Sequence, residues 1–98
     1  MSVAHLRTYT INAGQMDSWL ALFKDQLVPL LREHDIQVDG TWVNAEQTQF
    51  IWVRSYGDTE DDLKTKEAAF YGSAWWRANV DYVRSHLAHR EIALIRSV

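Results

Sequence analysis

The segment at residues 50–56, Phe-Ile-Trp-Val-Arg-Ser-Tyr, alternates aromatic or charged residues with aliphatic or small ones. This alternation predicts a β-strand, because neighbouring side chains of a strand point to opposite faces of the sheet. Residues 4–11 alternate in the same way. One face of these strands would carry Leu6, Thr8, Ile51, Val53 and Ser55, and the other would carry His5, Arg7, Tyr9, Phe50, Trp52, Arg54 and Tyr56. The second face, called here the arginine–aromatic face, is too apolar for water and too charged for an ordinary core. We interpret it as an enclosed surface.

Helical spacing of apolar residues follows the first strand. A stripe at residues 16–31 predicts a helix that ends near His34, with Asn12 as its N-cap and Gln15 reaching back to it. Pro29 removes one backbone hydrogen bond of this helix and should kink or divide it near Val28.

The second half of the chain predicts a hairpin, two helices and a last strand. Residues 37–44 and 50–56 would pair around a polar turn at 46–48. A helix capped by Asp58 or Thr59 follows, and its inward face would consist of Leu63, Glu67, Phe70 and Tyr71. Gly72 breaks this helix, Ser73 caps the next, and the next helix has an apolar stripe of Trp76, Val80, Val83 and Leu87. Residues 92–98 would form the fourth strand.

The resulting order, β-α-β-β-α-β, predicts an α+β fold of 98 residues with a split second helical region. Right-handed crossovers place both helical regions on one face of the sheet. We expect the helices to cover Leu6, Ile51 and Val53, which leaves the arginine–aromatic face bare. A large exposed aromatic face marks an interaction surface. The prediction is therefore a homodimer whose two sheets pack face to face.

The order of several short motifs resembles a known family. These motifs are the strand at residues 6–10, Gly14, Trp42, the strand at 50–56, and the segments at 68–71 and 73–75. Together they are similar to a NIPSNAP domain that covers residues 1–98 as one unit. The resemblance implies ferredoxin-like protomers that pair into a homodimeric α/β barrel. Relatives of this barrel include cofactor-free monooxygenases and small-molecule isomerases, and also members without shown activity, so no cofactor is implied and enzymatic activity stays open.

The arginine–aromatic face also supplies the candidate site. Guanidinium groups bind carboxylates in a bidentate manner, and aromatic walls enclose an apolar ligand. We predict that a small apolar or aromatic acid binds in the lumen between sheet and dimer partner, through Arg7, Arg54, Trp52, Tyr9, Tyr56 and Trp42. The face of Trp42 depends on the hairpin register. Candidates for an acid or base are Tyr9, Tyr56 and His5.

A non-enzymatic reading competes with this one. In it, both arginines pair with acidic residues across the dimer interface, and the chain is a structural or adaptor module that docks partners through Trp75 and Trp76. Arginine and aromatic residues are enriched at protein interfaces in any case.

Composition excludes several other classes. A net charge of −3 without a basic run argues against nucleic acid. The absence of cysteine excludes disulfides and thiolate sites. With neither a signal-peptide pattern nor a membrane-length apolar run, we expect a cytoplasmic protein without membrane insertion. His86 and His89 lie three apart near a helix end, where a surface role is favoured over a metal pair. We expect no metal site.

Overall fold

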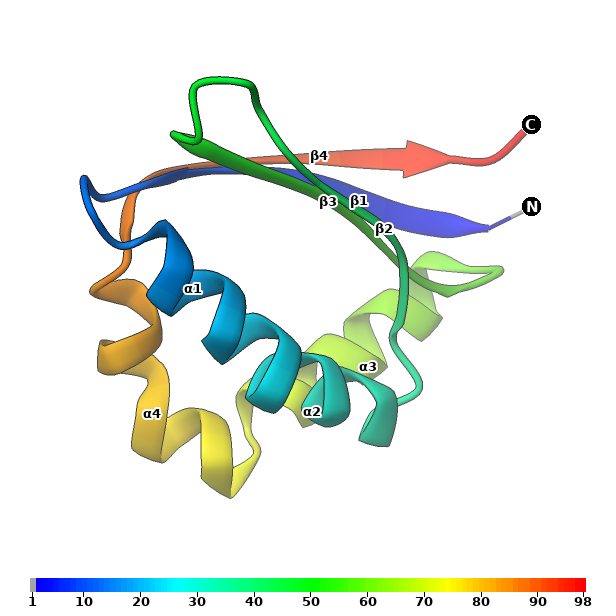
Figure 1. Ribbon diagram of the computed structural model, residues 1–98. Coiled ribbons are helices and arrows are strands. Elements are labelled where there is room, and N and C mark those ends of the chain that lie inside the picture. The colour runs from blue at the N-terminus through cyan, green and yellow to red at the C-terminus, as the bar shows by residue number, and fades with distance from the viewer. Residues whose placement is uncertain (1) are drawn as a thin grey trace.

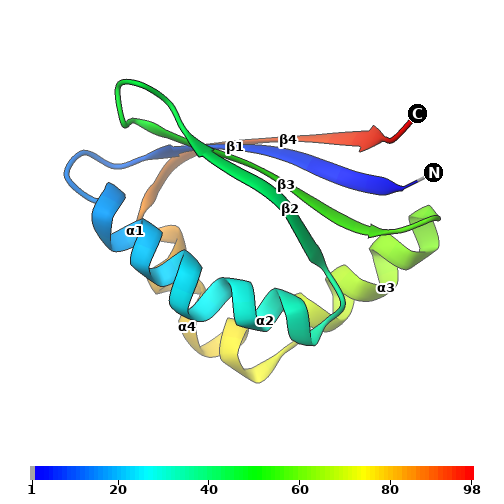
Figure 2. The ribbon, with the colours of Figure 1, turned by 45° about the vertical axis from the view of Figure 1, so that its right-hand side comes forward.

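The computed structural model describes residues 2–98, and its elements follow the predicted order. They are β1 (Val3–Ile11), α1 (Met16–Leu22), the π-helical turn η1 (Phe23–Leu27), α2 (Val28–Glu33), β2 (Gln37–Val43), β3 (Gln49–Gly57), α3 (Glu60–Tyr71), α4 (Ala74–Arg84) and β4 (Leu87–Arg96). The strands form one antiparallel sheet in the order β2-β3-β1-β4. All helices lie on one side of this sheet (Figure 1), and Figure 2 shows the same two layers from a second direction. The predicted α+β, ferredoxin-like protomer is confirmed.

Caps and breaks in the sequence explain where the last two helices begin. Thr59 accepts a hydrogen bond from the Asp62 amide, and the Asp62 side chain accepts from the Thr59 amide, which forms a capping box at the start of α3. Ser73 accepts from the Trp76 amide at the start of α4. The split predicted at Gly72 is therefore present.

The first helical stretch contains the irregularity that Pro29 predicts. Immediately before it, η1 widens into a π-helical turn, in which the Val28 amide donates to the Phe23 carbonyl. This wider turn carries the chain past a residue that has no amide proton and would crowd the preceding turn. The predicted Asn12 cap is wrong. Helix α1 begins after Gln15, and Asn12 instead donates to the Ser85 carbonyl at the end of α4.

The predicted orientation of the sheet is also wrong, because the helices cover the arginine–aromatic face. Phe50 and Trp52 of β3 are buried against Phe23, at ring-centroid distances of 4.8 and 4.9 Å. Trp19 of α1 packs edge-to-face on Tyr9 and Phe50. Such aromatic pairs contribute about 0.5–1.5 kcal/mol each beyond their buried area. The large rings of this face fill the space under the helices, and the smaller aliphatic side chains face the other way.

The opposite face of the sheet, called here the open face, is not covered by any element within residues 2–98 (Figure 1). Strand register places on it Leu6, Thr8, Trp42, Ile51, Val53, Ala93 and Ile95. The Trp42 side chain is 57% exposed and lies over Gly40, where a Cβ atom would come within 2.5 Å of its ring. The prediction that the arginine–aromatic face forms the homodimer interface is therefore wrong, because the chain's own helices bury Trp52 and Tyr56.

The last strand is longer than predicted. β4 begins at Leu87, so residues 87–91 belong to a strand and Leu87 does not extend the stripe of α4. His86, just before it, is 2% exposed, so its predicted surface role is wrong. No helix within residues 2–98 is long and apolar enough to cross a membrane.

Candidate functional site

Glu67 of α3 places its carboxylate between the two buried arginines of the sheet. Its Oε2 accepts a hydrogen bond of 2.5 Å from Arg54 and one of 3.2 Å from Arg7. Both arginine side chains are 3% exposed, whereas that of Glu67 is 20% exposed. One carboxylate reaches both arginines because β1 and β3 are neighbouring strands. The chain itself therefore supplies the carboxylate that two enclosed guanidinium groups require.

Tyr56 and His5 complete the hydrogen bonds around this carboxylate. The Tyr56 hydroxyl donates to Glu67 at 2.8 Å and accepts from Nε of Arg54 at 2.5 Å. Nδ1 of His5 lies 3.0 Å from the Tyr56 hydroxyl and 3.2 Å from a guanidinium nitrogen of Arg7. The Tyr56 hydroxyl thus links the Arg54 guanidinium to the Glu67 carboxylate, with the His5 ring beside it.

Two further tyrosines accept from the arginines. The Tyr71 hydroxyl accepts from Arg54 at 2.8 Å and from Arg7 at 3.3 Å, and the Tyr9 hydroxyl accepts from Arg7 at 2.8 Å. The Arg54 guanidinium also lies within 6 Å of four ring centroids, those of Trp52, Tyr56, Phe70 and Tyr71. Cation–π contacts of this kind favour a charged guanidinium in a desolvated site.

Burial and neighbouring charges shift the pKa values of the cluster. Burial alone would raise the pKa of Glu67, but the Tyr56 hydrogen bond and the charges of Arg54 and Arg7 hold it below its usual value. Burial and the charge of Arg7 lower the pKa of His5 to about 4. Burial raises the pKa of the Tyr56 hydroxyl above its ordinary value. At neutral pH the cluster therefore holds two guanidinium charges, one carboxylate and a neutral imidazole, for a net charge of +1.

These shifts predict that the protein loses stability in mild acid. The folded state binds fewer protons than the unfolded state wherever a pKa is lowered by folding, so stability rises with pH there. The pKa of His5 is 6.5 in the unfolded chain and about 4 in the folded one. The stability that depends on a neutral His5 is therefore fully present above pH 6.5 and is lost as the pH falls through about 4. Glu67 adds a further loss of stability as the pH falls below 4.5, the unperturbed pKa of its carboxyl group.

Urea unfolding measured between pH 7 and pH 4 tests this expectation. The free energy of unfolding should fall by on the order of 2 kcal/mol over this range because of His5. His5→Gln should flatten the upper part of the curve, whereas His89→Gln, which alters an exposed histidine, should leave it unchanged. Parallel curves for the wild type and His5→Gln would contradict the assignment.

A small cavity adjoins the cluster on the helix side of the sheet. Its lining includes four arginines, Arg7, Arg54, Arg84 and Arg90, and no acidic residue. Arg7 and Arg54 are buried at its inner end, whereas Arg84 at the end of α4 and Arg90 on β4 are exposed. A chain with a net charge of −3 thus gathers four of its ten basic residues around one cavity. Its volume is about 20 Å³, enough for one water molecule.

Three buried N–H groups of the cavity lining have no acceptor within residues 2–98. They are Nε of Arg7, Nε1 of Trp19 and Nε1 of Trp52. All three side chains are at least 97% buried. An unsatisfied buried donor costs about 1–3 kcal/mol, so such groups call for an explanation in a native structure. The lining as a whole therefore offers donors and positive charge, and it favours an acceptor or an anion.

The structure brings most of the sequence-predicted site residues together. Five of the six ligand-binding candidates, Arg7, Tyr9, Trp52, Arg54 and Tyr56, line the cavity or bind Glu67, and His5 joins them. Trp42 lies apart on the open face. The predicted location in a lumen facing the dimer partner is wrong for this group, because the chain's own helices cover it. Pairing of these arginines with acids across a dimer interface is wrong as well, since their partner is Glu67 of the same chain.

Sequence reasoning did not assign Glu67 and Tyr71 to the site. Both belong to the inward face predicted for residues 60–71, where a glutamate at an apolar position was the available signal. A charged residue on a buried helix stripe requires a partner of opposite charge, and only two arginines occupy the facing strands β1 and β3.

The two histidines near the end of α4 differ in their surroundings. His86 lies between the Ser18 hydroxyl, 2.9 Å from its Nε2, and the Tyr82 carbonyl, 3.0 Å from its Nδ1. His89 is exposed beside Glu91. Among residues 2–98 no group of three or more His, Asp or Glu side chains is arranged to hold a metal ion.

Known structures share this fold. A NIPSNAP family protein from Agrobacterium tumefaciens superposes with a TM-score of 0.89 at 17% identity, covering 100% of this chain and 94% of that one. An uncharacterized NIPSNAP domain protein from Burkholderia xenovorans gives 0.85 at 18% identity, covering 98% and 94%. A putative antibiotic biosynthesis monooxygenase from Nitrosomonas europaea gives 0.76 at 13% identity, covering 99% and 90%. At these identities the likeness concerns the fold alone.

The sequence itself decides the family. None of the curated proteins compared with this chain matches it. The NIPSNAP family profile, however, matches residues 4–97, which is nearly the whole chain. This match confirms the resemblance drawn from the ordered motifs around the strands β1 and β3. The chain belongs to the NIPSNAP family.

Proposed function

We propose that the protein binds a small apolar molecule carrying a carboxylate or another strong hydrogen-bond acceptor in the cavity between its sheet and its helices. The observation that carries the proposal is the set of three buried N–H donors without an acceptor within residues 2–98, all on residues of that cavity. A hydrogen bond to a buried donor contributes more free energy than one to an exposed donor, because the buried donor has no water to bind instead.

Charge supports an anion as the acceptor. Arg7 and Arg54 together exceed the single carboxylate of Glu67 by one positive charge. Arg84 and Arg90 add two further charges at the exposed end, and neither is in an ion pair with any residue of 2–98. A lining of one sign raises the local concentration of an oppositely charged ligand.

The aromatic walls suit the apolar part of such a molecule. Trp52, Phe70 and Trp76 line the cavity together with Leu27 and Leu31. Since the cavity has a volume of only about 20 Å³, a ligand larger than water requires movement of the side chains at its outer end. Ligand sites are commonly apolar with a few converging polar groups, and this cavity has that composition.

The proposal is one of binding rather than turnover. A catalytic acid or base must be free to exchange its proton with the ligand. Tyr56 is engaged by Glu67 and Arg54, Tyr9 accepts from Arg7, and His5 has a pKa of about 4. We therefore carry over no reaction from the monooxygenases that share the fold.

We further propose that the protein is a homodimer through its open face. Leu6 and Trp42 on this face are 37% and 57% exposed, and Ile51 and Val53 between them are half-buried. A sheet face of this composition is stabilised when a second sheet packs on it at about 10 Å. The cavity would then lie outside the dimer interface, with one copy in each protomer.

Titration calorimetry with formate, acetate and benzoate tests ligand binding. Benzoate should bind most tightly, and benzylamine, a cation of similar shape, should not bind. Arg84→Gln and Arg90→Gln should each weaken benzoate binding roughly three- to tenfold, as the loss of a charged hydrogen bond predicts. Arg77→Gln, which alters an exposed arginine of α4 outside the cavity lining, is the matched control. Equal affinities in all three variants, or no binding at millimolar benzoate, would refute the proposal.

A further inference from the structure

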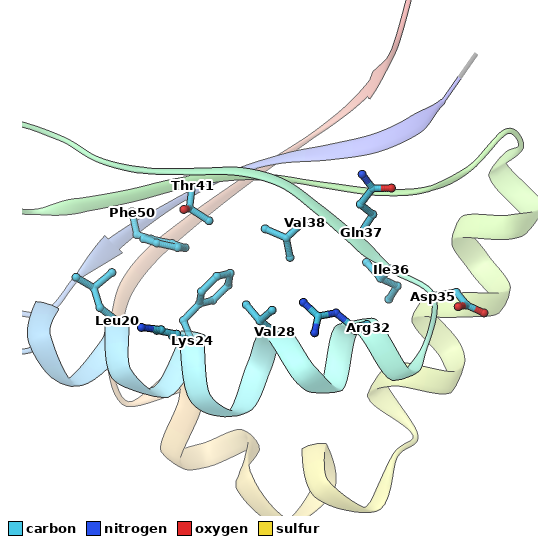
Figure 3. A pocket seen from close by; sticks show the side chains of 11 residues that line it. Leu20, Lys24, Val28, Arg32, Asp35, Ile36, Gln37, Val38, Thr41 and Phe50 are labelled. Carbon is cyan, nitrogen blue, oxygen red and sulfur yellow. The ribbon is translucent and has the colours of Figure 1, made fainter.

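A second hollow lies at the edge of the sheet, between the first helical stretch and the edge strand β2 (Figure 3). It is called here the β2 groove. Its volume is about 720 Å³, within the range of roughly 300–1,000 Å³ that is usual for ligand sites. It shares no lining residue with the arginine cavity. The two hollows are therefore lined by different residues.

Six of the eleven residues that line the β2 groove are apolar. Phe23 of η1 and Phe50 of β3 form its deep part and are 5% and 2% exposed. Leu20, Val28 and Val38 continue the apolar surface along its length, and all three are half-buried. Removing such a surface from water stabilises a complex by about 25 cal/mol per Å².

The π-helical turn belongs to this groove. Phe23 and Lys24 of η1 line it, and Val28, whose amide closes the wide turn, lines it as well. Such π-helical turns are found frequently at functional sites. Here the irregular turn also shapes the helix surface that faces β2.

Two basic side chains stand along the groove, and neither is in an ion pair with any residue of 2–98. These are Lys24 and Arg32, both exposed and eight positions apart, which corresponds to about 12 Å along a helix. Figure 3 shows the Arg32 guanidinium reaching from α2 into the gap below β2, next to Val28 and Ile36. Asp35 is the single acidic residue of the lining. The β2 groove thus combines a largely apolar lining with excess positive charge.

We propose that the β2 groove binds a free single-chain amphipathic carboxylate. The hydrocarbon chain lies over Phe23, Val28 and Phe50, and the carboxylate pairs with Arg32. This ligand matches both features of the groove, because its chain removes the apolar floor from water while its head neutralises a cation that is in no ion pair with residues 2–98. A neutral apolar segment of a protein partner would cover Arg32 without pairing it, at a desolvation cost. The inference goes beyond the proposed function, which concerns the arginine cavity.

The test compares three probes with the same chain and different heads: decanoate, decanol and decylammonium, each below its aggregation concentration. Methyl resonances of Val28 and Val38 report on the groove directly. Decanoate should shift both and bind most tightly. Arg32→Gln should weaken decanoate binding roughly three- to tenfold. Arg77→Gln, which alters an exposed arginine outside both linings, should leave the decanoate-induced shifts of Val28 and Val38 unchanged.

A blocking variant separates this ligand from other occupants. Thr41→Trp places a large ring at an exposed lining position of β2 and should abolish the decanoate-induced shifts of Val28 and Val38, while benzoate binding to the arginine cavity persists. Three results would overturn the proposal. These are equal affinity for decanoate, decanol and decylammonium, absence of binding by all three, and a change of oligomeric state in Thr41→Trp, which would make the groove an interface between copies.

Discussion

Replacing Glu67 with alanine is expected to lower the free energy of unfolding by about 3 kcal/mol, since breaking a buried ion pair costs about 3–5 kcal/mol. The variant leaves Arg7 and Arg54, each 3% exposed, without the carboxylate that pairs with both. The lower end of the range applies because the Glu67 side chain is 20% exposed. For a domain of this length the midpoint of thermal unfolding should fall by roughly 15 °C.

The ion pair between Glu60 and Arg96 supplies the control for this measurement. Its atoms are 3.0 Å apart, but both side chains are about half exposed. Glu60→Ala should therefore cost no more than about 1 kcal/mol. If thermal and urea unfolding give the same loss for Glu67→Ala and Glu60→Ala, the carboxylate of Glu67 does not compensate the two arginines.

The gap left by Glu67→Ala also provides a chemical rescue. Added acetate can pair with Arg7 and Arg54 in place of the missing side chain, and a ligand that binds only the folded state raises its stability. Acetate should therefore raise the unfolding midpoint of Glu67→Ala more than that of the wild type. An equal effect of acetate and of chloride on both proteins would mean that the arginines do not hold an anion there.

The second large effect is expected at the open face. Leu6→Glu should convert the proposed dimer to a monomer at micromolar concentration. A two-fold interface contains each residue twice, so one substitution introduces two buried, unpaired carboxylates. Each costs several kcal/mol in a dry interface, which raises the dissociation constant by more than about 100-fold.

Sedimentation of the wild type and two variants decides this point. Ile92→Glu is the matched control, because Ile92 is a similarly exposed apolar residue whose register with Arg7 places it on the helix side of the sheet. It should remain dimeric. A wild type that sediments as a monomer at micromolar concentration would refute the dimer, and equal behaviour of the two variants would refute the assigned face.

The alternation of residues 4–11 and 50–56 predicted the strands well, but it could not decide which face becomes the core. Both faces carry enough apolar area to be buried, and alternation is symmetric between them. The decision depends on Glu67, which lies far along the chain from Arg7 and brings a compensating charge under the helices. A pairing over that sequence distance leaves no periodic signal near the strands.

The boundaries of helices and strands could be predicted only where a local sequence signal marks them. Ser73 and Thr59 were visible as caps because capping depends on residues within one turn. The start of β4 was missed because residues 88–91 are exposed on an edge strand and have no apolar alternation to detect. Pro29 predicted a helix irregularity, but not that a π-helical turn would accommodate it.

The most direct measurement of the central claim is an NMR titration of the five tryptophan indole N–H groups with benzoate. Trp19 and Trp52 have buried indole N–H groups without an acceptor within residues 2–98, and Trp42 lies on the open face. Single Trp→Phe variants assign each indole resonance to its residue. The resonances of Trp19 and Trp52 should move downfield as they gain an acceptor, while that of Trp42 should not move. A shift of Trp42 alone, or no shift of Trp19 and Trp52 at saturating benzoate, would contradict a binding site beneath the helices.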